Sequence, residues 1–216
     1  MNIEELYRIN KLKDPRNQSF NKMPIVDKGW FDCNHKPEFY DKLIVERNVK
    51  SVLEIGSWLG QSTKFFADRV DFVIAIDTWE GSEEHKNGKE GKDHIENLSL
   101  LWDQFRSNTD EYKNIYPIRM SSKVAHYLKL PKVDLIFVDG AHDYISVYTD
   151  VNNYQKFLSE DGCMCGDDIQ EKDVQKALID WCNKNNMGFK VNYQWRIVDP
   201  KKEKIERKNV HVLGIK

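Results

Sequence analysis

Apolar and polar residues alternate along most of this chain in a way that predicts strands and helices in turn. Short apolar runs rich in β-branched residues predict buried strands at 51–56, 72–77, 115–119, 133–139 and 163–166. Stretches with helical spacing lie around them at 39–44, 61–69, 94–105, 122–128, 145–158 and 173–183. Because strands that alternate with helices build βα units, we expect an α/β fold with a doubly wound, mostly parallel sheet.

The end of the chain shows a different pattern. Two later strand candidates, 189–195 and 210–215, have no helix between them. Strands that are joined without a crossover helix pair antiparallel. We therefore expect an antiparallel hairpin at one edge of the sheet.

The start of the chain lies outside this alternation. Residues 2–12 carry apolar positions at helical spacing, and a polar loop follows from 14 to about 36. Long loops inside compact domains often form lids or binding loops, although a strap on the surface is equally open. We therefore divide the chain into an N-terminal segment, residues 1–35, with a lid or a dimer contact among its expected roles, and one α/β domain, residues 36–216.

Composition narrows the class of protein. The length of 216 residues predicts one main domain. With 33 Lys and Arg against 35 Asp and Glu, the chain lacks the excess of basic residues that is typical of a dedicated nucleic-acid binder. No apolar stretch approaches the roughly 18 residues of a membrane helix, and the first residues lack the apolar part of a secretion signal. The four cysteines form no C-x-x-C motif, so we expect reduced thiols. These features predict a cytoplasmic protein with no membrane or nucleic-acid partner.

The first strand-to-helix turn carries a glycine pattern typical of nucleotide sites. Ligands of open α/β sheets bind beyond the carboxyl ends of the strands, where this chain has Gly56 and Gly60. A dinucleotide fingerprint would also need glycine at 58 and 61, which here are Trp58 and Gln61. The spacing instead favours S-adenosylmethionine, whose methionine part needs no phosphate cradle. The cofactor-binding residues expected on this turn are Glu54, Gly56, Ser57, Gly60 and Ser62.

The ends of the next two strands supply further candidates for cofactor binding. Asp77 ends the second predicted strand, where a carboxylate can accept hydrogen bonds from both ribose hydroxyls of a nucleotide. Thr78 and Trp79 follow it, and the ring of Trp79 is expected either against the adenine or over the edge of the sheet. Ser121 and Ser122 open the helix after the third strand, where their hydroxyls suit the adenine edge or an N-cap.

Acidic residues dominate the ends of the last two parallel strands. Asp139 follows one of them, and Asp167 and Asp168 follow the other. Three like charges at one sheet edge are costly unless a cation neutralises them, and carboxylate oxygens suit Mg²⁺ or another divalent ion. The alternative is that one of the adjacent acids caps the next helix. His142 is placed to take a proton from a hydroxyl bound to such an ion, although a structural histidine is also open.

The chain resembles class I S-adenosylmethionine-dependent methyltransferases in four segments taken together: VLEIGSWLGQST, VIAIDTWEGSEEH, DLIFVDGAHDY and GCMCGDDI. More narrowly, it resembles the metal-dependent group that includes macrocin-type sugar O-methyltransferases and, more distantly, catechol O-methyltransferase. The resemblance covers about residues 48–185. It implies S-adenosyl-L-methionine as the cofactor and a seven-stranded, doubly wound Rossmann-like sheet whose last strand is antiparallel.

The resemblance also implies roles for individual residues. It implies that Glu54, Gly56 and Asp77 bind the cofactor. It also implies that Asp139, Asp167 and Asp168 hold the metal ion and that His142 is the general base. Asp139 is expected to contact the cofactor and to take part in catalysis as well. Catechol enzymes carry an amide in place of the second acid of the pair and use a lysine as the base, so Asp168 and His142 favour a sugar acceptor.

We therefore predict an enzyme, an O-methyltransferase that uses a divalent metal ion to methylate a hydroxyl of a glycan, a glycoside or a nucleotide-sugar. Two other functions stay open: O-methylation of a catechol or another small phenol, and a non-catalytic nucleotide-binding module of the same fold. The expected partner is a small-molecule or glycan sugar acceptor, and a homo-oligomer is compatible with the sequence.

Overall fold

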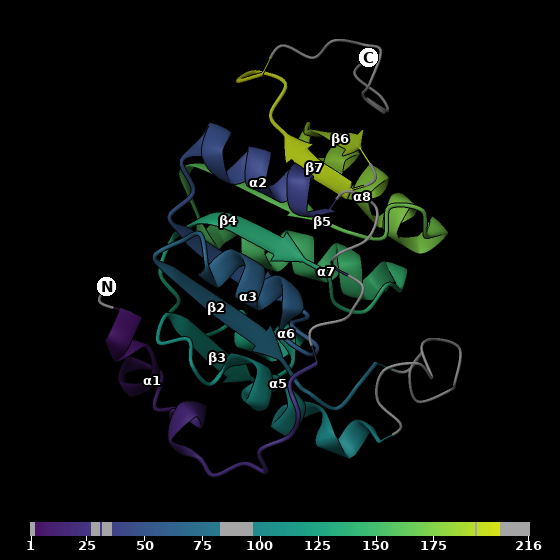
Figure 1. The fold of residues 1–216 in the computed structure, drawn as a ribbon. Helices are drawn as coiled ribbons and strands as arrows, with labels where there is room; N and C mark the ends of the chain where they lie inside the picture. The colour runs from purple at the N-terminus through teal and green to yellow at the C-terminus, as the bar shows by residue number, and fades with distance from the viewer. Residues whose placement is uncertain (1–2, 27–30, 32–35, 83–96, 193, 204–216) are drawn as a thin grey trace.

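The computed structural model describes residues 3–26, 31, 36–82, 97–192 and 194–203 of the chain, which fold around one seven-stranded sheet (Figure 1). The strand order is β3-β2-β1-β4-β5-β7-β6. β1 to β5 pair parallel, and β7 pairs antiparallel with both β5 and β6. The bounds are β1 (Ser51–Ile55), β2 (Phe72–Asp77), β3 (Ile115–Arg119), β4 (Val133–Val138), β5 (Leu158–Gly166), β6 (Gly188–Asn192) and β7 (Gln194–Val198). The predicted fold class is confirmed.

Helices cover both faces of the sheet. One face is packed by α2 (Lys36–Arg47), α3 (Gln61–Ala67) and α5 (Leu101–Thr109), and the other by α6 (Ser122–Ala125), α7 (Tyr144–Tyr154) and α8 (Lys172–Asn185) (Figure 1). Among the helices that the structure describes, none combines the length and the apolar character needed to cross a bilayer.

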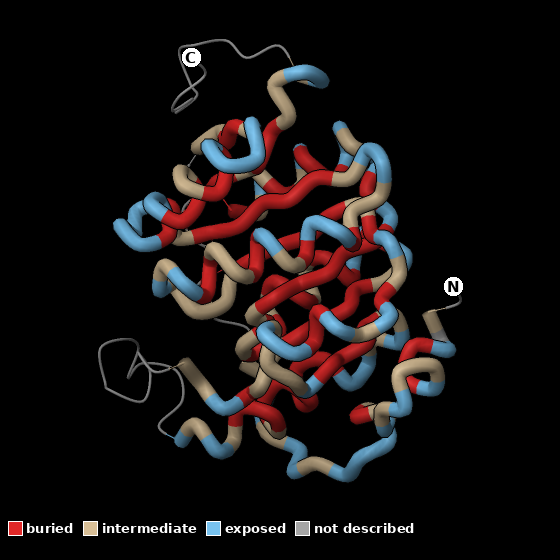
Figure 2. Tube along the Cα trace, turned by 180° about the vertical axis from the view of Figure 1, so that it is seen from behind, coloured by how far each residue is buried: buried red, intermediate tan, exposed pale blue. Residues whose placement is uncertain are grey.

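The core consists of two apolar layers, one on each face of the sheet. Side chains of a strand alternate between its faces, so neighbouring residues enter different layers. Val52 packs with the α2, α3 and α5 layer, whereas Leu53 and Ile55 pack with the α6, α7 and α8 layer. Burial follows the strands through the centre of the molecule and gives way to exposed residues on the outer sides of the helices (Figure 2). Covered on both faces, the parallel strands have the near-continuous apolar sequences that their position requires.

The expected elements on either side of the start of β5 differ from those observed. The helix expected at 145–158 ends earlier, because a 3₁₀ turn (Gln155–Phe157) and then β5 take over its last residues. Residues 160–162, which lie before the strand expected at 163–166, belong to β5, where the register shifts between the pairs Val133–Leu158 and Leu135–Cys163. Asp134 stabilises this irregularity by accepting a hydrogen bond from the Ser159 hydroxyl at 3.1 Å.

The terminal hairpin lies earlier in the chain than the sequence pattern predicts. The segment 189–195, read as one strand, falls within two antiparallel strands, β6 and β7, that together span 188–198. Period-two alternation is the same on both sides of a tight turn, so it does not reveal where a chain reverses. The other expected strand, 210–215, lies outside the described residues.

The first part of the chain is a strap along the β3 edge of the sheet. The helix expected at 2–12 is shorter, a 3₁₀ turn (Ile3–Glu5) followed by α1 (Leu6–Ile9). The Tyr7 hydroxyl donates to the carbonyl of Pro117 at 2.9 Å. Further along, the amides of Met23 and Val26 donate to side chains of α5.

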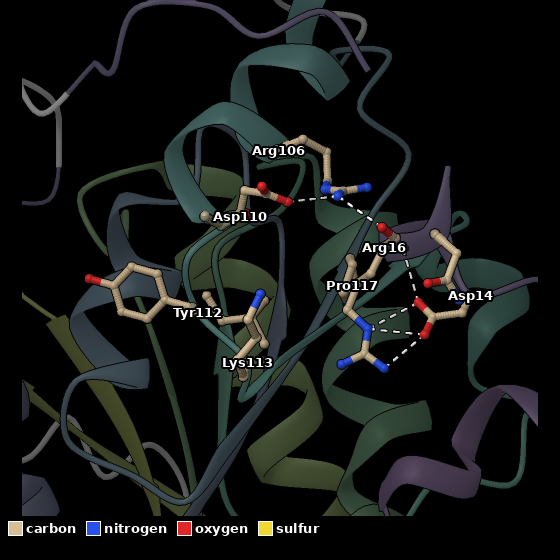
Figure 3. A pocket seen from close by; sticks show the side chains of 10 residues that line it. Asp14, Arg16, Arg106, Asp110, Tyr112, Lys113 and Pro117 are labelled. Carbon is tan, nitrogen blue, oxygen red and sulfur yellow. Dashed lines mark hydrogen bonds and ion pairs between the residues drawn. The ribbon is translucent and has the colours of Figure 1, made fainter. Parts of the chain in front are cut away.

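A small cavity of about 250 Å³ lies between this strap and α5 (Figure 3). Four of its charged groups form two ion pairs: Arg16 with Asp14 at 2.8 Å, and Arg106 with Asp110 at 2.9 Å. Arg106 also donates to the carbonyls of Pro15 and Arg16. These ion pairs and hydrogen bonds therefore hold the N-terminal strap against α5 around the cavity. Residues 27–30 and 32–35 lie outside the described residues, so a lid or dimer role for residues 1–35 stays a prediction.

Candidate functional site

A cavity of about 690 Å³ opens at the carboxyl ends of the parallel strands. This volume lies within the range of roughly 300–1,000 Å³ typical of small-molecule sites. The cavity wall contains most of the expected residues: Gly56, Ser57, Ser62, Asp77, Thr78, Ser121, Ser122, Asp139, His142, Asp167 and Asp168. Three expected residues, Glu54, Gly60 and Trp79, do not line it.

The two glycines of the first turn are required by close packing of protein against protein. Gly56 has φ of 88°, and a Cβ there would lie 2.0 Å from the carbonyl oxygen of Asp139. Gly60 has φ of 85°, and a Cβ there would lie 2.7 Å from Thr109 on α5. Only glycine adopts such backbone angles readily and leaves this space. The turn after β1 is thus pressed between the loop after β4 and α5.

Glu54 shapes the same turn from below. Its side chain is completely buried, and its carboxylate accepts hydrogen bonds from Ser57 at 2.7 Å, from Ser62 at 2.5 Å and from Thr63. Burial raises its pKa to about 7, although the three hydroxyl donors act in the opposite direction. Because Ser57 and Ser62 line the cavity, Glu54 positions the wall and does not itself face the cavity.

Asp77 joins two turns of the cavity wall. Its Oδ2 accepts a hydrogen bond from the Trp58 amide at 2.9 Å, and its Oδ1 accepts one from the Trp79 amide at 2.7 Å. Both tryptophans have positive φ, 44° and 53°, which is strained for a side chain of this size. Burial raises the pKa of Asp77, opposed by these backbone donors. Each oxygen keeps a second lone pair for a ligand hydroxyl.

The ring of Trp79 lies in the core. It is 2% exposed, it packs against Trp102 and Phe105 with centroid separations of 4.8 and 4.4 Å, and its Nε1 donates to the Trp58 carbonyl at 2.9 Å. It is therefore not placed against a ligand, and of the two expected positions it is nearer to the covering role. Trp58 lines the cavity instead.

Both serines at the start of α6 line the cavity and also stabilise local structure. Ser121 is the N-cap, since its hydroxyl accepts from the Lys123 amide at 3.3 Å. The Ser122 carbonyl accepts from the Tyr154 hydroxyl at 2.9 Å. Capping uses an acceptor lone pair of Ser121 and leaves its O–H as a donor toward a ligand.

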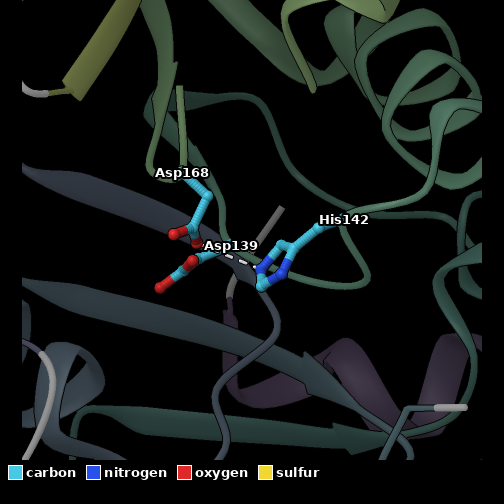
Figure 4. Close-up of side chains that lie close together, drawn as sticks. All are labelled: Asp139, His142 and Asp168. Carbon is cyan, nitrogen blue, oxygen red and sulfur yellow. Dashed lines mark ion pairs between the residues drawn. The ribbon is translucent and has the colours of Figure 1, made fainter. Parts of the chain in front are cut away.

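The acidic end brings two carboxylates and a histidine together (Figure 4). Asp139, His142 and Asp168 each offer one ligand atom, and these atoms lie within 4.8 Å of one another. The Nε2 of His142 is 3.0 Å from Oδ2 of Asp168. Asp168 has φ of 54°, a strained conformation at the end of β5. Carboxylate and imidazole groups at this spacing can hold a divalent ion.

The electrostatics of this cluster differ from residue to residue. Burial raises the pKa of Asp139 well above its ordinary value, and the charges of Asp167 and Asp168 add to the effect. Burial also acts on Asp168, but the hydrogen bond from His142 and the charges of His142 and Lys36 outweigh it and lower its pKa. Asp168 is therefore the more readily ionised of the two carboxyl groups.

Asp167 stands apart from this cluster. Its carboxylate forms an ion pair with the ammonium of Lys36, the first residue of α2, and both residues are more than nine-tenths buried. Burial raises the pKa of Asp167 against the effect of Lys36. Of the three acids expected to hold a metal ion together, Asp139 and Asp168 meet with His142, whereas Asp167 meets a lysine.

Lys36 and Asp150 both line the cavity, although the sequence pattern predicts a site role for neither. No local pattern marks Lys36, because its partner Asp167 is distant in sequence. The position of Asp150 in the helical pattern could have indicated a role in the site. Asp150 occupies a buried helical position, one residue before Val151 and three after Val147, where an apolar side chain is usual.

Comparison with known proteins agrees with this architecture. A search of curated proteins finds no match to the chain. Among solved structures it resembles a Staphylococcus aureus protein assigned as a caffeoyl-CoA O-methyltransferase (19% identity, TM-score 0.56, covering 90% of this chain and 88% of that one). It also resembles the O-methyltransferase NovP (14%, 0.55, 76% and 79%) and the TDP-rhamnose 3'-O-methyltransferase of calicheamicin biosynthesis (11%, 0.51, 76% and 80%). These three likenesses concern the fold.

The family follows from the sequence itself. Residues 53–169, more than half of the chain, match the family described as a methyltransferase domain. The matched segment begins in β1 and ends just after Asp167 and Asp168, so it includes the turns that build the cavity. The chain therefore belongs to the methyltransferase domain family and is a methyltransferase with the class I fold.

Proposed function

We propose that this methyltransferase transfers the methyl group of S-adenosylmethionine to a sugar hydroxyl with the help of a divalent cation. The observation that carries the proposal is the meeting of Asp139, His142 and Asp168 in the wall of one cavity that also contains the turns after β1, β2 and β3. The first set suits proton removal and cation binding, and the second suits a nucleoside with an amino-acid tail.

The cofactor would lie along the ends of β1 to β3. Asp77 supports this placement because its carboxylate is fixed by two backbone amides and keeps lone pairs for ribose hydroxyls. Ser57 and Ser62 are held by Glu54 on the neighbouring turn, where the methionine part would lie. The Ser121 hydroxyl is available as a donor to a ring nitrogen.

The acidic cluster fits a divalent ion by its donor chemistry. Asp168 adds to the cost of ionising Asp139, so this pair gains from a cation, and the carboxylates of Asp139 and Asp168 lie close enough to share one while His142 stays beside it as the base. An ion bound there supplies Lewis-acid polarisation of an acceptor oxygen. Asp167 would support the site from behind while Lys36 balances its charge.

His142 is the group that would remove the acceptor proton. Asp168 accepts a hydrogen bond from Nε2–H, which leaves the lone pair of the neutral imidazole on Nδ1. The acceptor oxygen, once its proton passes to His142, forms the new bond to the methyl carbon as the bond from that carbon to sulfur breaks. Alignment of oxygen, methyl carbon and sulfur in the cavity would supply much of the rate.

The acceptor is assigned to the sugar class because Asp168 and His142 occupy the positions that separate the sugar enzymes from the catechol enzymes in the resemblance. A sugar hydroxyl is far less acidic than a phenol, so it needs a base such as the Asp168–His142 pair. One of the enzymes with the same fold acts on TDP-rhamnose. A small phenol remains the competing acceptor.

The test is an acceptor panel with the purified protein. Release of S-adenosylhomocysteine is measured with nucleotide-sugars, simple glycosides and catechol, each with added Mg²⁺ and with excess EDTA. We expect turnover on a sugar that EDTA abolishes and Mg²⁺ restores. His142→Gln should lose turnover while calorimetry still detects S-adenosylhomocysteine. Asp134→Asn, which alters a carboxylate at the opposite end of β4, is the control and should keep turnover.

Each part of the proposal fails on a different result. Full activity in EDTA would contradict the role of the cation. Turnover on catechol alone would contradict a sugar acceptor, and unchanged turnover of His142→Gln would contradict the role of His142 as the base. Absence of S-adenosylmethionine binding would overturn the proposal as a whole.

A further inference from the structure

Asp150 is a buried carboxylate of the cavity that the proposed reaction does not use. It lies on α7, it is 3% exposed, and it lines the cavity. Its Oδ1 is buried and has no hydrogen-bond partner. Within the part of the chain that the structure describes, no cation lies within ion-pair distance of it. A buried acceptor without a donor is costly, which points to a ligand.

The surroundings of Asp150 place it at the start of α6. Burial raises the pKa of Asp150, and the nearby Ser122 hydroxyl acts in the opposite direction. The Tyr154 hydroxyl, one helical turn further along α7, donates to the Ser122 carbonyl at 2.9 Å. On the other side, Oδ2 would lie 3.7 Å from a Cβ on Gly140, so the carboxylate fits against the loop after β4. It is thus held between two elements with one oxygen unsatisfied.

A ligand that donates a hydrogen bond would offset the unfavourable surroundings of the Asp150 carboxylate. Burial raises the pKa of Asp150 to about 7, with the charge of Lys123 opposing this and that of Asp143 adding to it. A ligand that donates N–H to Oδ1 would favour the ionised carboxylate. Ser121 supplies a donor to the same region through its hydroxyl, so the two residues together offer one donor and one acceptor. An adenine edge has the complementary pattern, a ring nitrogen beside an exocyclic amine.

We propose that Asp150 accepts a hydrogen bond from the exocyclic amine of the cofactor's adenine and selects a 6-amino purine against a 6-oxo purine. The assignment rests on the proposed function, because it takes S-adenosylmethionine as the occupant of the cavity. It adds a residue outside the strand-end turns that determines which nucleoside the protein accepts.

The experiment compares two ligands by calorimetry: S-adenosylhomocysteine and its deaminated form, S-inosylhomocysteine, in which a carbonyl oxygen replaces the amine. The wild-type protein should bind the adenosyl form about tenfold to a hundredfold more tightly, the range expected for a hydrogen bond to a charged group. Asp150→Asn offers an amide that can donate to the carbonyl oxygen. It should reduce this ratio at least about tenfold and bring it near one.

Asp173→Asn is the control, because it makes the same change at an exposed carboxylate in the first turn of α8 that does not line the cavity. It should leave the ligand ratio as in the wild type. Thermal melting of both variants shows that they fold, and the wild-type ratio tests the proposal even if Asp150→Asn does not fold. Equal binding of the two ligands by the wild type, or an unchanged ratio in Asp150→Asn, would overturn the role of Asp150 alone. Binding of neither ligand would overturn the proposed function and this role with it.

Discussion

The buried carboxylate of Glu54 should make the stability of this protein depend on pH in a window that one substitution removes. Its pKa rises from the ordinary value of 4.5 to about 7 in the folded protein, chiefly because it is completely buried. The unfolded chain therefore loses this proton near pH 4.5 and the folded protein near pH 7. Between these values the folded state holds more protons, so the free energy of unfolding falls as the pH rises.

The size of the effect follows from the two pKa values. Each pH unit between them is worth about 1.4 kcal/mol, so full passage through the window destabilises the fold by about 3 kcal/mol. Between about pH 5 and about pH 8.5 the expected loss is about 2.5 kcal/mol. Glu54→Gln is uncharged throughout, and its amide can donate to one of the hydroxyls that Glu54 now accepts from, since hydroxyls also accept.

The assay is urea unfolding of both proteins at the two pH values, followed by tryptophan fluorescence. The free energy of unfolding of the wild type minus that of Glu54→Gln should fall by about 2.5 kcal/mol from the lower to the higher pH. Glu46→Gln, at a side chain that is 59% exposed on α2, controls for net charge and should give a difference that is flat within about 0.5 kcal/mol. Parallel curves for the wild type and Glu54→Gln would refute the reasoning, because they would mean that Glu54 ionises alike in both states.

Two further substitutions test the packing and charge of the site. Gly56→Ala should destabilise the fold by about 3 kcal/mol or more in urea unfolding, because its φ is positive and its Cβ would strike the Asp139 carbonyl. Gly140→Ala is the control and should cost less than about 1 kcal/mol, because its Cβ would meet no atom nearer than 3.6 Å. Comparable losses in both would show that the contact does not constrain the turn. Lys36→Met should cost about 3–5 kcal/mol because it leaves Asp167 buried without its cation, and adding Asp167→Asn should recover most of that loss. A double variant no more stable than the single one would contradict the pairing.

The sheet could be predicted from the sequence because both its signals are local. Each buried parallel strand is a short apolar run, and each crossover helix has its own spacing. The irregular start of β5 could not be predicted in this way, because residues 160–162 have turn-like composition, whereas the neighbouring Ser159 donates to Asp134 on β4, far away in sequence. The hairpin of β6 and β7 likewise depends on where the chain reverses.

The candidate site divides along the same line. Residues at strand ends, such as Asp77, Asp139 and Asp168, could be named because topology brings strand ends together. What each side chain does there depends on partners that are far away in sequence. Lys36 pairs with Asp167, and the ring of Trp79 turns into the core, neither of which the spacing of residues encodes.

The contact at Gly56 also bears on how the cavity can adapt. The Gly56 amide donates to the Ile76 carbonyl at 2.9 Å, and the Asp139 amide donates to the Ile55 carbonyl at 2.8 Å, so three strand ends are joined side by side without a gap. A wall built in this way cannot widen where Gly56 meets Asp139, because the space is already filled by backbone. Acceptors of different sizes would therefore have to be accommodated by side-chain changes elsewhere in the wall, while the relative position of the methyl donor and the acidic cluster stays constant.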